Sequence, residues 1–217
     1  MAWLKGKVCL GFLCAVLPLA AMAEDVRILA FGDSLTQGYG LIESQGFVPQ
    51  LDAWLEAQGA EVAVINGGVS GDTSAGGAAR VDWSLTPDVD AMIVTLGGND
   101  LLRGIDPSVT RDNIDTILTT AKANSVEVLL VGMQAPGNYG AEYKQAFDRL
   151  YPELAEKHGT LYAESFFDGL GTSDPAQARE LFQDDGIHPN ADGVAKIVEG
   201  LGPKVLDLID RVNDPGA

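Results

Sequence analysis

Short apolar runs alternate with longer amphipathic segments along most of this chain. The apolar runs predict buried strands at residues 26–31, 61–65, 91–96 and 126–131, with a weaker candidate at 160–163. Apolar positions at helical spacing predict helices at 47–58, 112–123, 139–158 and 191–212. Strands that alternate with helices form a parallel sheet covered on both faces. The pattern therefore predicts the α/β class, as a three-layer α/β/α sandwich around a mostly parallel sheet.

The first residues carry a different pattern. Two lysines precede an apolar run over residues 8–19, and a small-x-small sequence follows at 21–23. This layout predicts a secretory signal peptide over residues 1–23, with the mature protein beginning near Glu24. An uncleaved membrane anchor is the weaker alternative, because a span needs about 20 apolar residues.

Cysteine content and charge narrow the function classes. Cys9 and Cys14 both lie in the predicted signal peptide, so the mature chain would have no disulfide, thiol nucleophile or cysteine metal site. Loss of that peptide removes two lysines and no acid, which changes the formal charge from -17 to -19. Such acidity argues against nucleic acid and anionic lipid as partners. Residues 24–217 show no linker or repeat and predict one domain.

The first predicted strand ends abruptly on Gly32-Asp33-Ser34. In parallel α/β sheets the functional crevice lies outside the carboxyl ends of the strands, so Ser34 is placed as a candidate nucleophile. A serine hydroxyl needs a neighbouring base before it can attack. The alternative is an ordinary strand–turn–helix junction in which Asp33 or Ser34 caps the next helix.

Two glycine-rich loops follow the next strands, at residues 66–73 and 97–100. If Ser34 attacks a carbonyl, the developing oxyanion needs preorganised hydrogen-bond donors. The candidates are the backbone N–H groups of Ser34 and Gly71 and the side-chain amide of Asn99. Gly71 could instead be a turn glycine with a positive φ, and Asn99 an Asx turn or a helix cap.

The mature chain offers two histidines as the base. His158 falls at the end of a predicted helix beside a glycine, which indicates a surface or capping residue. His188 lies in a loop before the last helix, three residues after Asp185, whose carboxylate can orient the ring as in a Ser-His-Asp triad. Asp184 could compete for that role. The same loop could also cap the last helix through Asn190.

Rival site chemistries have less support. A divalent cation could collect Asp33, Asp184, Asp185 and His188, but no HExxH or comparable ligand spacing is present. None of the glycine-rich loops matches a nucleotide-binding motif. A phosphoryl hydrolase needs cationic groups around its substrate, and Arg103 is the only basic residue close to a motif.

Together, the segments FGDSLTQGYG, VSGDTSAGG, LGGNDLLRG and QDDGIHPN resemble the four sequence blocks of the GDSL, or SGNH, hydrolase family, in the family's order. The resemblance implies a flavodoxin-like fold and an esterase that needs no cofactor or metal. It also implies one role for each matching residue. These are Ser34 as nucleophile, His188 as base, Asp185 as its orienting carboxylate, and Ser34 N–H, Gly71 N–H and the Asn99 amide as the oxyanion hole.

The segments GGNDLLRG and PGNYGAEYKQAFDRLYPELA look most like the bacterial periplasmic branch of arylesterases, acyl-CoA thioesterases and lysophospholipases. That branch implies a monomeric protein, periplasmic or secreted, that hydrolyses small-molecule acyl esters. It also places the loop at 131–137, with the small residue Ala135, beside an acyl pocket. A carbohydrate O-acetyl esterase and a non-catalytic lipid- or glycan-binding protein remain as alternatives.

Overall fold

Five parallel strands form the central sheet of this computed structural model, which describes residues 1, 25–171 and 178–214. The strand order is β2-β1-β3-β4-β5, and every neighbouring pair is parallel. The strands are β1 (Val26–Gly32), β2 (Val62–Gly68), β3 (Ala91–Thr95), β4 (Glu127–Val131) and β5 (Leu161–Ala163).

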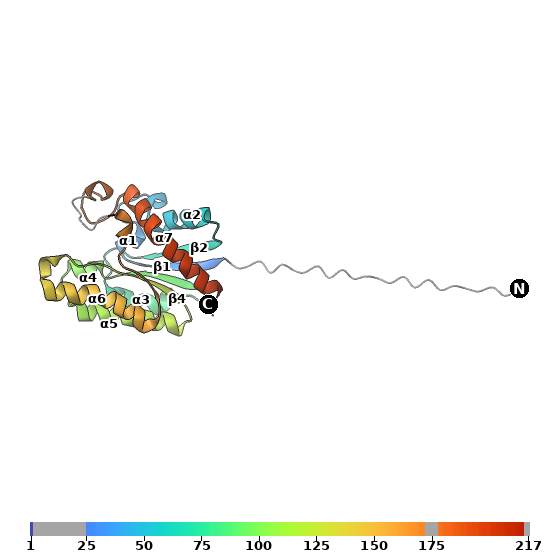
Figure 1. Cartoon of the computed structure of the whole chain (residues 1–217), viewed down its shortest axis with the longest axis horizontal. Helices are drawn as coiled ribbons and strands as arrows, with labels where there is room; N and C mark the ends of the chain where they lie inside the picture. Colours follow the sequence, from blue (N-terminus) through green and yellow to red (C-terminus); the bar gives the residue numbers. More distant parts are fainter. Residues whose placement is uncertain (2–24, 172–177, 215–217) are drawn as a thin grey trace.

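Helices cover both faces of the sheet (Figure 1). On one face lie α2 (Phe47–Ala57) and α7 (Ala191–Asn213), and on the other lie α3 (Ser74–Ser84), α5 (Pro107–Ala123) and α6 (Ala141–His158). The predicted three-layer α/β/α sandwich is confirmed. The remaining helices are short: α1 (Ser34–Gln37), α4 (Gly98–Leu102), and the 3₁₀ helices η1 (Glu43–Gln45), η2 (Gly137–Tyr139), η3 (Asp168–Leu170) and η4 (Arg179–Leu181).

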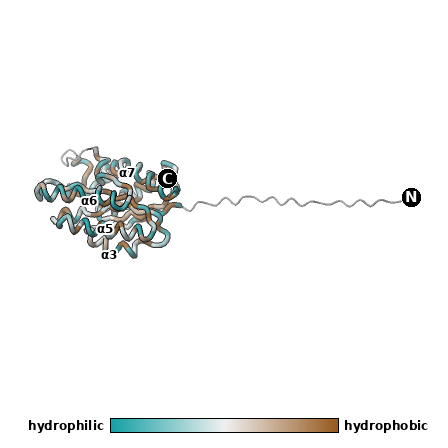
Figure 2. The backbone as a smooth tube through the Cα atoms, turned by 60° about the horizontal axis from the view of Figure 1, so that its bottom comes forward, coloured by the Kyte–Doolittle hydropathy of each residue, from teal (hydrophilic) through white to brown (hydrophobic). Residues whose placement is uncertain are grey.

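The core lies between the sheet and the two helix layers. All five residues of β3 are buried, as are all but the first residue of β4, because helices cover both faces of these inner strands. Apart from α3, the covering helices are amphipathic, and Figure 2 shows hydrophilic and hydrophobic stretches alternating along α5, α6 and α7. This arrangement brings the carboxyl ends of β1, β2 and β3 to one edge of the sheet.

The structure differs from the sequence prediction at three elements. Strand β2 continues three residues further, to Gly68, because it pairs with β1 as far as Gly32. Helix α5 begins at Pro107, where the Asp106 side chain accepts a hydrogen bond from the Ser108 N–H and caps the first turn. Helix α3 was not predicted, because its glycines leave it almost no amphipathic pattern.

Glycine at position 77 is what lets α3 lie close to the sheet. A Cβ atom there would lie 2.3 Å from the Leu96 side chain, so a larger residue would require the buried Leu96 to move. The predicted signal peptide, with Cys9 and Cys14, lies outside the described residues apart from Met1. In the parts of the chain that the structure describes, no helix combines the length and apolarity that crossing a membrane requires.

Candidate active site

Ser34 lies at the junction between β1 and α1, at the carboxyl edge of the sheet. Asp33 caps α1, because its Oδ1 atom accepts a hydrogen bond of 3.0 Å from the Leu35 N–H. The capping alternative is therefore correct for Asp33, but it leaves the next side chain free for chemistry. The Ser34 Oγ atom lies 2.8 Å from Nε2 of His188, 154 residues further along the chain.

The His188 loop is closed at its base by an antiparallel bridge between Phe182 and Pro189. Within it the Gln183 N–H donates to the His188 carbonyl oxygen at 2.8 Å. The chain turns through Gly186, whose φ of +68° is left-handed. The loop then runs into α7, where the Asn190 side chain accepts a hydrogen bond from the Gly193 N–H, so Asn190 is the predicted cap.

Asp185 holds the imidazole ring from behind. Its Oδ2 atom lies 2.7 Å from Nδ1 of His188, and its Oδ1 atom accepts the backbone N–H groups of Ile187 and His188. These hydrogen bonds, that of the His188 N–H first, lower the pKa of Asp185 to about 2. Asp185 therefore stays ionised at neutral pH. Its neighbour Asp184 is exposed and does not hold the ring.

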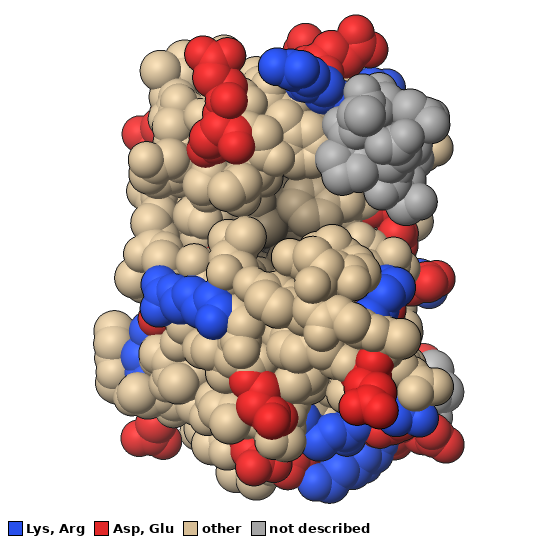
Figure 3. All heavy atoms as spheres, turned by 90° about the vertical axis from the view of Figure 1, so that its left-hand side faces the viewer, with Lys and Arg blue, Asp and Glu red and all other residues tan. Residues whose placement is uncertain are grey.

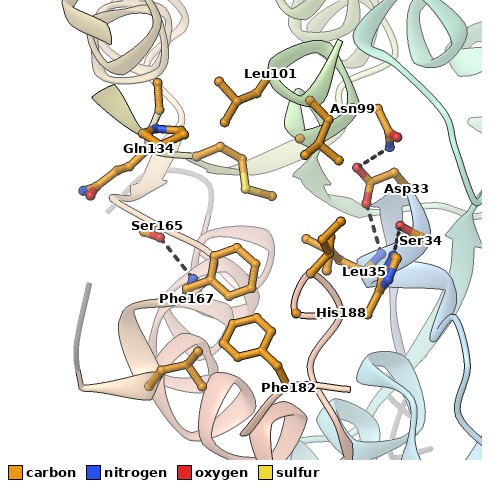
Figure 4. Close-up of a pocket in the computed structure, with 18 of the residues that line it drawn as sticks. Asp33, Ser34, Leu35, Asn99, Leu101, Gln134, Ser165, Phe167, Phe182 and His188 are labelled. Carbon is orange, nitrogen blue, oxygen red and sulfur yellow. Dashed lines mark hydrogen bonds between the residues drawn. The ribbon is translucent and has the colours of Figure 1, made fainter. Parts of the chain in front are cut away.

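Gly71 and Asn99 line the same pocket as Ser34 and His188. Gly71 has a φ of +82°, so the turn-glycine interpretation also holds. The Asn99 Nδ2 atom donates to Asp33 Oδ2 at 3.1 Å, as Figure 4 shows. An amide nitrogen carries two hydrogens, so this bond leaves one for a ligand.

Asp33 also lines this pocket, where the sequence predicts it only as a helix cap or a metal ligand. Its side chain is buried, and desolvation raises its pKa to about 6 against the opposing effects of Leu35, Asn99 and His188. A neighbouring carboxylate, Asp72, raises the pKa further. The signal available in the sequence was its place directly before Ser34, at the end of a buried strand.

This pKa predicts a pH dependence of stability. The pKa of Asp33 is 3.8 in the unfolded chain and about 6 in the folded protein, so between these two pH values the folded state binds more protons than the unfolded state. The free energy of unfolding should therefore lose about 3 kcal/mol through Asp33 as the pH rises from about 4 to above 6. Asp33→Asn should lack this loss, which urea denaturation at pH 4 and pH 7.5 measures. If the free energy of unfolding falls equally in the wild type and in Asp33→Asn between these pH values, the raised pKa of Asp33 is contradicted.

The second histidine lies elsewhere. His158 ends α6, and its Nε2 atom lies 2.6 Å from Asp115 Oδ1 on α5. Only 9% of its side chain is exposed, so it is not a surface residue. It stands in the last turn of α6, before the C-cap Gly159, as the other alternative expected, and its ring also joins α6 to α5. The hydrogen bond from His158, followed by that from Lys157, lowers the pKa of Asp115.

A pocket of about 910 Å³ opens beside Ser34 and His188. Figure 4 shows Leu101, Phe167 and Phe182 around its interior, and the two phenyl rings lie 5.9 Å apart between centroids. On the face that Figure 3 shows, uncharged side chains surround a hollow. Among the described residues, no three His, Cys, Asp or Glu side chains are grouped to hold a metal ion.

The fold and this site define a class: a serine hydrolase built on a parallel α/β/α sandwich. The chain belongs to the GDSL-like lipase/acylhydrolase family, whose model matches residues 30–196. The predicted family and the predicted serine esterase class are both confirmed.

Three similar proteins illustrate this membership. Esterase TesA of Pseudomonas aeruginosa is 37% identical over 200 residues, covering 92% of this chain and 96% of its own. Thioesterase 1/protease 1/lysophospholipase L1 of Escherichia coli K12 is 34% identical over 204 residues, covering 93% of this chain and 94% of its own. AlinE4, an SGNH-hydrolase family esterase, has a crystal structure that matches with a TM-score of 0.70 and 40% sequence identity, covering 86% of this chain and 98% of its own.

Proposed function

We propose that Ser34, His188 and Asp185 form the catalytic triad of a carboxylic ester hydrolase. The observation that carries this proposal is the continuous hydrogen-bonded chain from Asp185 Oδ2 through both nitrogens of His188 to Ser34 Oγ, at 2.7 and 2.8 Å. The three residues come from two distant parts of the sequence. A non-catalytic binding protein would have no use for such a chain.

The proposed reaction has two steps. As the Ser34 oxygen attacks the ester carbonyl, His188 Nε2 takes its proton, and Asp185 stabilises the imidazolium that forms. Collapse of the tetrahedral intermediate breaks the bond to the leaving alcohol, which receives that proton and leaves the acyl group on Ser34. Water then repeats the sequence, with His188 as base, and releases the acid. These steps use protein groups and water only.

The oxyanion would be held by the N–H groups of Ser34 and Gly71 and by the Asn99 amide. Supporting this, Asp33 Oδ2 accepts a hydrogen bond from Asn99 Nδ2 at 3.1 Å, which fixes the orientation of the amide. A donor held in advance need not reorganise as charge develops, which is how such groups accelerate acyl transfer. All three donors are uncharged, so they would not hold a carboxylate product strongly.

The pocket favours an acyl chain over a sugar as the group beside Ser34. Its volume lies within the range of small-molecule sites, and its apolar lining matches a hydrocarbon chain. The apolar side chains that line it include Leu35, Leu101, Met133, Ala135, Phe167, Leu170 and Phe182. Oxygen esters with medium acyl chains are therefore the proposed substrates, and the name of the Escherichia coli relative adds thioesters and lysophospholipids as candidates.

Acyl-chain selectivity tests this proposal. Phe167 lines the pocket and is only half-buried, so Phe167→Ala should fold. We expect the variant to lower kcat/KM for a p-nitrophenyl decanoate about 10-fold and to leave p-nitrophenyl acetate unchanged, because only the longer chain contacts the ring. Steady-state hydrolysis across acyl lengths measures both. Equal losses on both esters would show that Phe167 does not contact the acyl chain.

We further propose that residues 1–23 are cleaved on export and that residues 24–217 act as a monomer in the periplasm or outside the cell. The supporting features are the order of lysines, apolar run and small residues, and the acidity of the remainder. Acyl-CoA is a cytoplasmic substrate, so an exported enzyme would meet oxygen esters instead.

A further inference from the structure

Arg80 is a buried arginine close to the site, and neither the triad nor the oxyanion hole uses it directly. It projects from α3, and only 8% of the residue is exposed. A buried guanidinium needs an ion-pair partner and hydrogen-bond acceptors, because it cannot lose its charge. The contacts of its guanidinium therefore show which groups compensate its buried charge.

The contacts of the Arg80 guanidinium reach two segments, the loop that contains Gly71 and the end of β1. Nε forms a 2.7 Å ion pair with Asp72 Oδ2, and Nη2 donates to the Gly32 carbonyl oxygen at 2.9 Å. The group also lies over the Phe31 ring, 3.9 Å from its centroid, which is a cation–π contact. Asp72 directly follows Gly71, and Gly32 lies two residues before Ser34. One side chain thus joins the Gly71 loop to the end of β1.

Further contacts hold the Gly71 loop, which joins β2 to α3 over residues 69–73. Its Val69 N–H donates to the same Gly32 carbonyl at 3.0 Å, so two groups fix that oxygen. A Cβ atom on residue 76 would lie only 1.8 Å from Asp72 Oδ1, so glycine there leaves the room that the carboxylate occupies. From the other side Arg103 Nη2 donates to the Gly71 carbonyl at 2.8 Å.

We propose that Arg80 is a positioning residue for the reaction: through Asp72 it sets the place of the Gly71 N–H relative to Ser34. This inference rests on the proposed oxyanion hole. Two of its donors lie on separate segments, Ser34 at the start of α1 and Gly71 in the loop after β2. The Arg80 ion pair with Asp72 and hydrogen bond to Gly32 link those segments. A guanidinium can bond Asp72 and Gly32 at once with a fixed angle between them, and a lysine ammonium cannot reproduce that geometry.

Arg80→Lys and Arg80→Met test the proposal. We expect Arg80→Lys to lower kcat about 10-fold and Arg80→Met about 100-fold, with KM unchanged in both. Displacement of a donor by about 1 Å costs about 100-fold in rate, and lysine keeps part of the link. Asp72→Asn removes the partner charge while keeping the arginine, and should lower kcat about 10-fold. If Arg80→Met fails to fold, Asp72→Asn still tests the link between Arg80 and Asp72. Melting temperature is measured for each variant.

A matched control separates positioning from loss of stability. Val81 is the next residue on α3 and is buried in the core, and its side chain has no polar group that could form a hydrogen bond or ion pair. Val81→Ala should lower the melting temperature and leave kcat unchanged. If Val81→Ala lowers kcat as much as Arg80→Lys, or if Arg80→Lys and Asp72→Asn keep full kcat, the proposal is overturned.

A double-variant comparison identifies where Arg80 acts. Asn99→Ala alone should lower kcat about 10²- to 10³-fold. In the Arg80→Met background the same change should cost less than about 10-fold, because the hole is already disrupted. Fully multiplicative losses would overturn the positioning role and leave the proposed function standing. Undiminished turnover by Ser34→Ala, measured alongside, would instead remove the proposed function itself.

Discussion

Ser34→Ala is expected to lower kcat for p-nitrophenyl esters by about 10⁴- to 10⁶-fold. The reason is that the serine oxygen lies 2.8 Å from His188 Nε2, and within residues 25–171 and 178–214 no other side chain is hydrogen-bonded to that nitrogen. The fold should survive the change, because Asp33 and not Ser34 provides the cap of α1. Steady-state hydrolysis, with the melting temperature recorded alongside, measures the effect.

The matched control for this variant is Ser70→Ala. Ser70 lines the same pocket, but its hydroxyl donates to Gln37 Oε1 at 2.6 Å, whereas His188 Nε2 is hydrogen-bonded to Ser34. Its replacement should leave kcat within about 2- to 3-fold of the wild type, as for an exposed polar side chain away from the reacting atoms. Comparable activity of the two serine variants would contradict the nucleophile assignment.

Asp185→Asn is expected to lower kcat by about 10⁴-fold with a small change in KM. Asparagine can still accept the backbone N–H groups of Ile187 and His188 through its oxygen. Its NH₂ group would then face Nδ1 of His188, where the carboxylate oxygen now lies at 2.7 Å. The ring would be held in the wrong tautomer, with a proton on Nε2 that prevents it from accepting the serine proton.

Asp184→Asn provides the control for charge, because it removes the same charge from the adjacent, exposed residue. We expect it to retain wild-type kcat. Since the pKa of Asp185 is about 2, activity should also show no loss from protonation of this carboxylate between pH 4 and pH 8. A loss in Asp184→Asn equal to that in Asp185→Asn would contradict the orienting role.

Much of the site was predictable, because each part carries a local signal. Buried inner strands leave uninterrupted apolar runs, so β1, β3 and β4 could be recognised within one or two residues. The turn chemistry after each strand then placed Ser34 and Asn99 at one edge of the sheet. The spacing of Asp185 and His188 within one short loop made their pairing predictable, and the geometry agrees.

What could not be predicted depends on contacts between distant residues. Helix α3 packs through glycine, and glycine gives no amphipathic signal. The bond between Asn99 and Asp33 joins residues 66 positions apart, and the burial that raises the pKa of Asp33 comes from the assembled site. Arg80 lies on α3, for which the sequence predicts no helix, so no local pattern marks it. Its position over Phe31 makes it a buried link between two loops.

The most direct test of the central claim is covalent labelling of the wild-type protein with a fluorophosphonate probe, followed by peptide mass mapping. Such probes react with a serine that a neighbouring base activates. Our account predicts one phosphonyl group per chain, attached to Ser34, with hydrolysis lost in proportion to labelling. Complete labelling of a different serine, or a fully active protein that takes up no label, would contradict it.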